Sequence, residues 1–416
     1  VTNIGACAFY WLNNMTSVNI PASVTTIGDE AFGGCSGLSS VTFLCTTPPT
    51  TSGSQFYGVS DNLKIQVPAG SVDAYKQHTI WGKHPDRIES IPWTGSGTES
   101  DPYIISHKDE FDLLAKRVSE GNNYYGTYFQ LTNDITVTTM VGTSSYRFGG
   151  IILGDGRTIT ANLGTESEPV GEGALFHYVD GATFKNLKVA GDIYTNAKSS
   201  ATLASIVTGN VTIDGCTVSA ALHSTINGDG SQGGVVGMVK GAVTIKGTIF
   251  NGSLLGETTH SIGGFVGWNE SNSSGTITFE NCLFAPVSVT MGTQNSCTFS
   301  RTRSTSAITF TDCYYTTDVG TKQGQQLYAE PQTDFCSQFT AINGNTYYLV
   351  GTVQLTTTSP YTYDGSNTIS VVSTLTYNGT ELAAENYTTS VTLDDVAVSK
   401  IEKSGLYTLT ATAKEG

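Results

Sequence analysis

Charged residues are scarce in this 416-residue sequence, at 13% where globular proteins average about 25%. Basic residues are the scarcest, since 20 Lys and Arg stand against 35 Asp and Glu, for a net charge of −15. Nucleic acids and anionic membrane surfaces attract basic stripes, so we expect neither as a partner. No apolar run approaches the roughly 20 residues that span a bilayer, so we expect no membrane insertion within this chain.

Recognisable catalytic and cofactor motifs are also absent. The sequence has no GxSxG elbow, P-loop or dinucleotide fingerprint, and its six histidines form no HExxH pair. Its eight cysteines lack the paired CxxC spacing of a zinc site or a redox dithiol. We therefore expect no cofactor, no metal and no enzyme activity.

One seven-residue phrase recurs between Thr183 and Tyr315, as TFKNLKV, TIDGCTV, TIKGTIF, TFENCLF and TFTDCYY. Its fourth residue is always Asn, Gly or Asp, the types that accept positive φ at least cost. The phrase therefore predicts a left-handed bend in each copy, at Asn186, Gly215, Gly247, Asn281 and Asp312.

The bend resets the alternation of side chains, so Phe184, Leu187 and Val189 can all point inward. The bends lie 29 to 34 residues apart, a period at which one unit must stack on its neighbours to bury its apolar face. A second ladder aligns Leu175, Leu203, Val235 and Phe265. With room for one further strand, each rung is predicted to hold roughly three strands of a parallel β-helix.

The second ladder includes the phrases Gly233-Gly-Val-Val-Gly237 and Gly263-Gly-Phe-Val-Gly267. They resemble the GLUG motif of bacterial surface proteins.

The first ninety residues contain a different repeat. Ile4-Gly-Ala-Cys-Ala-Phe9 recurs as Ile27-Gly-Asp-Glu-Ala-Phe32, a step of 23 residues that is typical of leucine-rich repeats. The phrase resembles the BspA-like leucine-rich repeats of bacterial (Bacteroides-type) surface proteins, which implies a cell-surface location. Residues 63–91 are similar to the closing cap of such an array. Because few repeats without an N-terminal cap are marginally stable, we expect the native protein to extend upstream.

A Gly/Ser/Pro-rich stretch at 93–102 marks a boundary, and one amphipathic helix follows it. Ser106 and Asp109 stand at capping-box spacing, and Gly121 is the expected stop. The apolar positions of this helix are Phe111, Leu114, Ala115 and Val118. We expect the helix to cover the open end of the β-helix.

From about residue 347 the pattern changes to evenly spaced strands. Tyr361-Thr-Tyr-Asp-Gly365 and the segment 404–411 resemble bacterial immunoglobulin-like modules, which implies a β-sandwich. The predicted fold is mainly β in three domains. These are leucine-rich repeats with a C-terminal cap (1–92), a right-handed parallel β-helix with an N-terminal capping helix (93–330) and an Ig-like β-sandwich (331–416).

The outward position before each bend is the best candidate for chemistry. It is occupied by Lys185, Asp214, Lys246, Glu280 and Thr311. A lyase-like acid/base cluster and a solvated ladder of alternating charge are the two interpretations. Stacking would place Lys246 between Asp214 and Glu280, and this relieves the repulsion that a catalytic carboxylate pair must retain, so the ladder is favoured.

Exposed aromatic residues offer a second kind of site, because sugar rings pack on aromatic faces. Trp268 and Tyr314 are the candidates for a glycan-binding face, against packing in a turn or cap. The segment Asn227-Gly-Asp-Gly-Ser231 could ligate calcium, but it lacks a downstream bidentate Glu and is interpreted as a plain turn.

Three cysteines fall on the inward ladder: Cys216, Cys282 and Cys313. They are interpreted as core thiols, with a disulfide between neighbouring rungs as the alternative. The state of the other five stays open: Cys7, Cys35, Cys45, Cys297 and Cys336.

The sequence thus favours a monomeric, extracellular, surface-attached or secreted adhesin that binds host, matrix, glycan or cell-surface ligands. A carbohydrate-active β-helix, either a polysaccharide lyase or a hydrolase, is the first alternative. A structural stalk that presents an upstream domain is the second.

Overall fold

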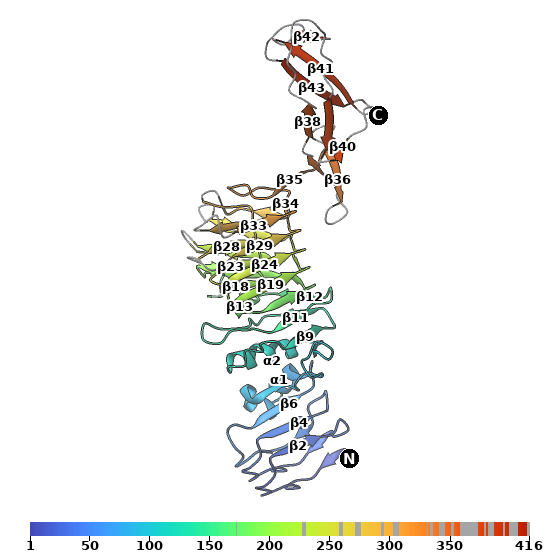
Figure 1. Ribbon diagram of the computed structural model, residues 1–416. Helices are drawn as coiled ribbons and strands as arrows, with labels where there is room; N and C mark the ends of the chain where they lie inside the picture. The colour runs from blue at the N-terminus through green and yellow to red at the C-terminus, as the bar shows by residue number, and fades with distance from the viewer. Residues whose placement is uncertain are drawn as a thin grey trace. The chain divides into compact units, whose positions relative to one another are not determined.

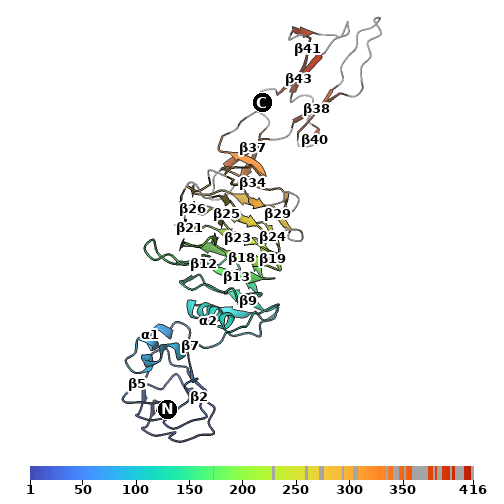
Figure 2. The same ribbon diagram turned by 90° about the vertical axis from the view of Figure 1, so that its left-hand side faces the viewer.

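The computed structural model divides the chain into two compact units, Val1–Gly324 and Gln325–Gly416. Figures 1 and 2 show the chain from two sides. The structure describes residues 1–171, 173–226, 230–257, 261–270, 276–292, 295–302, 308–330 and 332, and after these the strands β36 to β43.

The first unit begins with a short solenoid of two parallel sheets. One consists of β1 (Asn3–Ile4), β3 (Thr26–Ile27) and β5 (Thr50–Thr51). The other consists of β2 (Ser17–Ile20), β4 (Ser40–Phe43), β6 (Lys64–Val67) and β7 (Ile88–Ser90). Ile4 pairs with Ile27 and Val18 with Val41, so the predicted 23-residue register is confirmed.

A stack of aromatic rings packs against the aliphatic core of this short solenoid. Phe9, Phe32 and Phe56 stack from rung to rung, with ring centroids 5.2 and 5.8 Å apart. Trp81 continues the stack 5.8 Å from Phe56, and its indole N–H donates to the carbonyl of Pro49 at 2.9 Å. Trp81 lies in a closing segment made of α1 (Val72–Gln77), η1 (Trp81–Lys83) and η2 (Pro85–Arg87).

The predicted amphipathic helix is α2 (Lys108–Ser119), and its expected apolar residues are buried in the core that continues into the next strands. The predicted cap was wrong by one residue. His107 is the N-cap, and the Glu110 carboxylate accepts from the His107 backbone N–H at 3.0 Å. Asp109 instead accepts from the backbone N–H of Gly70 at 2.8 Å, a long-range contact that local spacing does not reveal.

The rest of the first unit is a parallel β-solenoid whose rungs stack in register (Figure 1). The longest sheet, counted over the described strands of the first unit, has eight strands: β8 (Tyr103–Ile105), β9 (Tyr128–Leu131), β11 (Ile151–Leu153), β14 (Thr183–Lys185), β19 (Asn210–Asp214), β24 (Ala242–Lys246), β29 (Ile277–Glu280) and β33 (Ile308–Thr311). A second sheet follows the bends with β10 (Ile135–Val137), β12 (Thr158–Ala161), β15 (Lys188–Ala190), β20 (Thr217–Val218), β25 (Ile249–Phe250), β30 (Leu283–Phe284) and β34 (Tyr314–Tyr315).

Three further sheets complete the turns. The first, which carries the candidate site below, contains β13 (Phe176–Asp180), β18 (Ala204–Thr208), β23 (Val236–Val239), β28 (Val266–Asn269) and β32 (Ser300–Thr302). The second contains β16 (Asp192–Thr195), β21 (Ala221–Ser224), β26 (Ser253–Leu255) and β31 (Ser288–Val289). The third contains β17 (Ser199–Ser200), β22 (Ser231–Gly233) and β27 (Ile262–Gly263).

The predicted left-handed bends are confirmed. φ is between 49° and 65° at all five positions, which are Asn186, Gly215, Gly247, Asn281 and Asp312. The side chains predicted to point inward around the first bend, Phe184, Leu187 and Val189, are fully buried.

The prediction of about three strands per rung was too low. The turn from Ala204 to Gly233 contains five described strands, β18 to β22. The bend at Gly215 divides one predicted strand into β19 and β20, and the Ser/Gly-rich strand β22 was not recognised as a strand.

Glycines let β22 pack against β23 and β28. A Cβ atom on Gly267 would lie 2.5 to 2.7 Å from the backbone of Ser231 and Gln232, closer than atoms can approach without a shift. The last glycine of the Gly-Gly-x-Val-Gly phrase is therefore required by a close backbone approach rather than by its φ.

The second unit is made of antiparallel pairs. β37 (Thr346–Val350) pairs with β35 (Gln325–Tyr328) and β36 (Cys336–Thr340). Two three-stranded groups follow: β38 (Val353–Thr357) with β39 (Ser373–Tyr377) and β40 (Thr380–Glu381), and β42 (Val396–Val398) with β41 (Tyr387–Leu393) and β43 (Tyr407–Ala413). The segments 361–365 and 404–406 of the immunoglobulin-like phrases lie outside the described residues, and that assignment stays a prediction.

Candidate functional site

The charged residues singled out from the sequence form one outward column across the longest sheet. Lys185 pairs with Asp214, Asp214 with Lys246, and Lys246 with Glu280. The Lys246 ammonium lies 3.3 Å from the Asp214 carboxylate, with side chains 43% and 34% exposed. At that exposure water screens the pair, so it contributes at most about 1 kcal/mol.

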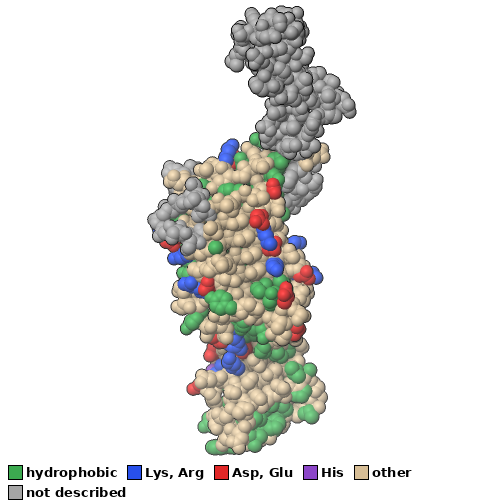
Figure 3. Space-filling model, in the orientation of Figure 1, with side chains coloured by type: hydrophobic (Ala, Val, Ile, Leu, Met, Phe, Trp, Pro, Cys, Tyr) green, Lys and Arg blue, Asp and Glu red, His purple; other side chains and the backbone are tan. Residues whose placement is uncertain are grey.

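The predicted aromatic candidates do not join this column. Tyr314 lies on β34, in the sheet that follows the bends, where it pairs with Leu283. Trp268 lies on β28, in the sheet that precedes the charged one. The structure therefore distributes the sequence candidates over three sheets. Figure 3 shows charged side chains of both signs, several of them next to one another, on a mostly uncharged face.

The sheet of β13, β18, β23 and β28 is labelled in Figure 1. It carries a column of outward, nonpolar side chains. Tyr178 pairs with Ile206, Ile206 with Met238, and Met238 with Trp268. All four side chains are half-buried. Of these four residues, sequence analysis singled out only Trp268. The ladder of Leu175 and Leu203 locates Tyr178 and Ile206, because each lies three residues after a ladder position.

Trp268 is held from one side by an arginine. The guanidinium carbon of Arg301 lies 5.1 Å from the centre of the indole ring, within the range of a cation–π contact. Arg301 is 7% exposed and donates to the carbonyls of Asn295, Gly230 and Ser261 at 2.8, 2.9 and 3.1 Å. These bonds fix the guanidinium, so the indole is supported by a rigid partner.

A polar column lies beside the nonpolar one. Asp180 and Thr208 lie two residues further along β13 and β18, so they face the same way, and Lys240 and Glu270 hold the equivalent positions directly after β23 and β28 end. Lys240 and Glu270 form an ion pair at 3.3 Å. Together the two columns form a surface of partly exposed nonpolar side chains edged by hydrogen-bonding groups, which we call the two-column face.

The two-column face ends in a recess near the start of the solenoid. The Tyr125 hydroxyl donates a hydrogen bond to the Asp180 carboxylate at 2.5 Å. The Arg147 guanidinium donates one to the Thr208 hydroxyl at 3.0 Å. The recess has a volume of about 310 Å³ and is lined also by Asn123 and Tyr146. Its lining is mainly polar, so it extends the hydrogen-bonding edge rather than the nonpolar column.

The buried cysteines Cys216, Cys282 and Cys313 lie inside the solenoid rather than on this face. Burial raises the pKa of the Cys216 thiol to about 11, as expected for an inert core thiol. All seven cysteines whose side chains the structure describes are free thiols. Among the described residues, no three His, Cys, Asp or Glu side chains are placed to hold a metal ion. Residues 227–229 of the segment 227–231, interpreted as a plain turn, lie outside them.

Comparison with known proteins assigns one part of the chain. Residues 2–80 match the family described as BspA type leucine rich repeat region (6 copies). No curated protein sequence matches the chain. Among solved structures, the chain is similar to one titled a putative immunoglobulin A1 protease from Bacteroides ovatus, with 14% identity and a TM-score of 0.35, over 61% of this chain and 94% of that chain. No helix among the described residues is long and apolar enough to cross a membrane.

Proposed function

We propose that this protein is an adhesin-like binding protein of a bacterial cell surface, attached or secreted, and that it recognises an extracellular glycan. The leucine-rich repeats support the location, because residues 2–80 match the BspA type, which resembles repeats of bacterial surface proteins. Stacked solenoids support binding, because they present extended, rigid side surfaces.

The nonpolar column from Tyr178 to Trp268 is the observation that carries the glycan proposal. Sugar rings pack their apolar faces on aromatic and aliphatic side chains, while their hydroxyls require hydrogen-bonding partners at the edge. The two-column face supplies both along the same strands. A repeating polysaccharide lying along the stacked rungs would meet one nonpolar side chain and one polar side chain per rung.

Catalysis is a weaker interpretation of the same solenoid. Asp214 and Glu280 lie two rungs apart in the outward column, with about 10 Å between their Cα atoms. Lys246 lies on the rung between them and pairs with Asp214 at 3.3 Å. It therefore occupies the space that an attacking water would need.

A glycan array followed by affinity measurement on the full chain tests the proposal. Trp268→Ala is expected to weaken binding at least about tenfold, and Trp268→Phe less. Tyr314→Ala is the matched control, because it removes a half-buried aromatic side chain from another sheet. Equal losses in the two alanine variants, or none in Trp268→Ala, would contradict the proposal.

The two alternatives give different results in the same experiments. Release of reducing ends from acidic or neutral polysaccharides, abolished by Asp214→Ala, would establish a carbohydrate-active enzyme. Absence of binding in a broad screen of glycans and matrix proteins would favour a structural stalk.

Several finer assignments belong to this proposal. We take the solenoid to be right-handed, α2 to be its N-terminal cap, and the glycine phrases to be GLUG motifs. The C-terminal unit is taken as an Ig-like spacer and the protein as a monomer. The burial of Phe111 and Leu114 under the first solenoid strands supports the cap.

A further inference from the structure

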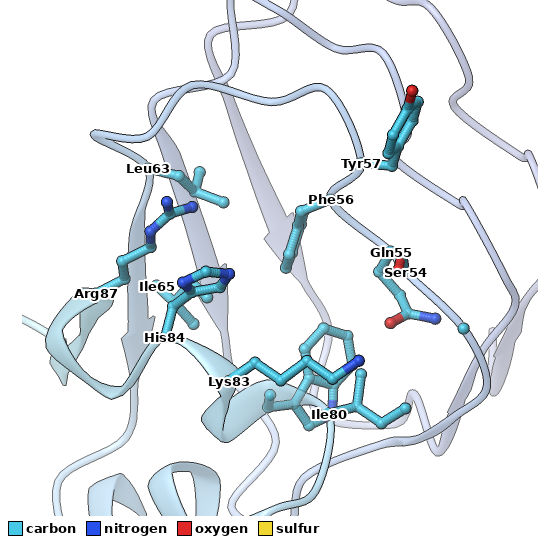
Figure 4. Close-up of a pocket in the computed structure, with 12 residues that line it drawn as sticks. Ser54, Gln55, Phe56, Tyr57, Leu63, Ile65, Ile80, Lys83, His84 and Arg87 are labelled. Atoms are coloured by element: carbon cyan, nitrogen blue, oxygen red, sulfur yellow. The ribbon is translucent and has the colours of Figure 1, made fainter.

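The closing segment of the leucine-rich repeats encloses a cavity of about 200 Å³ (Figure 4). Its lining is mixed. The apolar part comes from Phe56, Leu63, Ile65, Ile80 and Trp81, and the polar part includes Ser54, Gln55 and the basic side chains at its mouth. An apolar cavity of about 150 Å³ holds one benzene ring. The space therefore suits a single aromatic ring with one polar substituent.

One polar side chain is buried in the wall. Gln55 is 2% exposed and occupies the place that Ala8 and Ala31 hold in the two preceding repeats, directly before the stacked phenylalanines. Alanine at this position is enough for the repeats to stack, as Ala8 and Ala31 show. The third repeat therefore carries an amide that its own packing does not require.

The orientation of this amide leaves its oxygen available. Gln55 Nε2 donates to the carbonyls of Ser52 and Gly28 at 2.7 and 3.5 Å. Gln55 Oε1 is buried and has no hydrogen-bond partner among the described residues. Figure 4 shows the Gln55 amide and the Lys83 chain extending from opposite sides of the cavity. A buried acceptor without a partner favours a ligand that brings an N–H or O–H donor.

The mouth of the cavity is basic in a chain that is acidic overall. Lys83, His84 and Arg87 line it, although the chain holds only 20 Lys and Arg in 416 residues. Arg87 pairs with the fully exposed Asp61 at 2.9 Å. Such an exposed pair is weak and can exchange its carboxylate for that of a ligand.

We propose that this cavity binds a tyrosine side chain of an acidic peptide segment. The ring packs in the cavity beside the half-buried Phe56 and Ile80, the phenolic O–H donates to Gln55 Oε1, and a neighbouring carboxylate of the peptide meets Lys83. This site shares no residue with the two-column face, so it is independent of the glycan proposal.

The direct test is fluorescence anisotropy of the full chain with a labelled nonapeptide that carries one tyrosine between aspartates. A matched peptide has phenylalanine in place of tyrosine. The unmodified protein is expected to bind the tyrosine peptide about tenfold more tightly, because only tyrosine satisfies Gln55. Gln55→Leu keeps the volume and removes the acceptor, so it is expected to abolish this preference while still binding the phenylalanine peptide.

A second pair of variants tests the mouth without disturbing the core. Lys83→Gln is expected to weaken the binding of both peptides several-fold and to reduce the salt dependence of binding. Lys76→Gln, an exposed basic residue of α1 outside the cavity lining, is expected to change neither. Equal affinity for the two peptides in the unmodified protein, or no binding of either, would overturn the proposal. Binding of free p-hydroxyphenylacetate as tightly as the peptide would also overturn it, in favour of a small-molecule site.

Discussion

Arg117 of helix α2 donates to the carboxylate of Glu89 at 2.6 Å, so the last strand of the leucine-rich repeats is linked to the first helix of the solenoid. Lys116 donates to the other carboxylate oxygen. Glu89 is 4% exposed, so two cations satisfy one buried anion. The two repeat systems therefore share a buried ionic contact in addition to a chain connection.

Glu89→Gln is expected to lower the free energy of unfolding by about 2–3 kcal/mol, because it leaves Lys116 without its anion and Arg117 with only the exposed Glu120. Glu120→Gln is the matched control. It removes the exposed partner of the same arginine and is expected to cost less than about 1 kcal/mol. Denaturant unfolding measures both variants. Cleavage at residues 93–102 in limited proteolysis should rise only in Glu89→Gln, and equal effects would contradict the linking role.

The same contact predicts an acid sensitivity. Burial alone would raise the pKa of Glu89, but the hydrogen bond from Lys116 and the charges of Lys116, Arg117 and Lys64 outweigh it and lower the pKa. As pH falls, the unfolded chain therefore takes up this proton first. The contribution is complete above the unfolded pKa of about 4.3 and is lost as pH falls through the lower folded value. Glu89→Gln should flatten the pH dependence of the unfolding midpoint below pH 5.

The sequence predicted those features of the fold that depend on residues close together in the chain. A left-handed bend needs a particular residue type at one position, and Asn186, Asn281 and Asp312 have positive φ where the phrase predicts it. The inward positions followed from the bend, and the 23-residue step gave the pairing of Ile4 with Ile27.

Contacts between distant segments escaped prediction. Asp109 leaves the expected capping box because it accepts from Gly70, which lies 39 residues earlier. The strand β22 exists because it packs on β23 and β28, and its sequence alone indicates a turn. The cavity beside Gln55 depends on Trp81, which reaches it from the closing segment. None of these pairings leaves a periodic trace in the sequence.

Asn281 tests the energetic role of the bend. Its φ is 51°, a conformation that is costly for β-branched residues, so Asn281→Val is expected to lower the free energy of unfolding by about 1–2 kcal/mol. Asn281→Gly should change the free energy of unfolding by less than about 0.5 kcal/mol, because glycine tolerates this φ. Thermal unfolding followed by circular dichroism distinguishes them. Similar effects of Val and Gly would show that side-chain contacts, rather than φ, select Asn.

Gly267→Ala tests the close approach of β22 to β28. The added methyl group would meet the backbone of Ser231 and Gln232 at 2.5 to 2.7 Å, so we expect a loss of about 1–3 kcal/mol from forced backbone shifts. Gly5→Ala is the control, since a Cβ there has nothing within 4 Å, and it should change stability by less than about 0.5 kcal/mol. Equal unfolding midpoints for the two variants would contradict the packing of β22 on this face.

The outward charges of the longest sheet can be tested by reversing the central one. Lys246→Ala should cost only a few tenths of a kcal/mol, since it removes one exposed ion pair. Lys246→Glu places three negative charges on consecutive rungs, between Asp214 and Glu280, so we expect a larger loss of about 1 kcal/mol at low salt. Screening should remove most of the difference between the two variants near 1 M salt, where the Debye length falls to about 3 Å. A difference that persists at high salt would mean that Lys246 acts through specific contacts, and the ladder interpretation of this column would then be wrong.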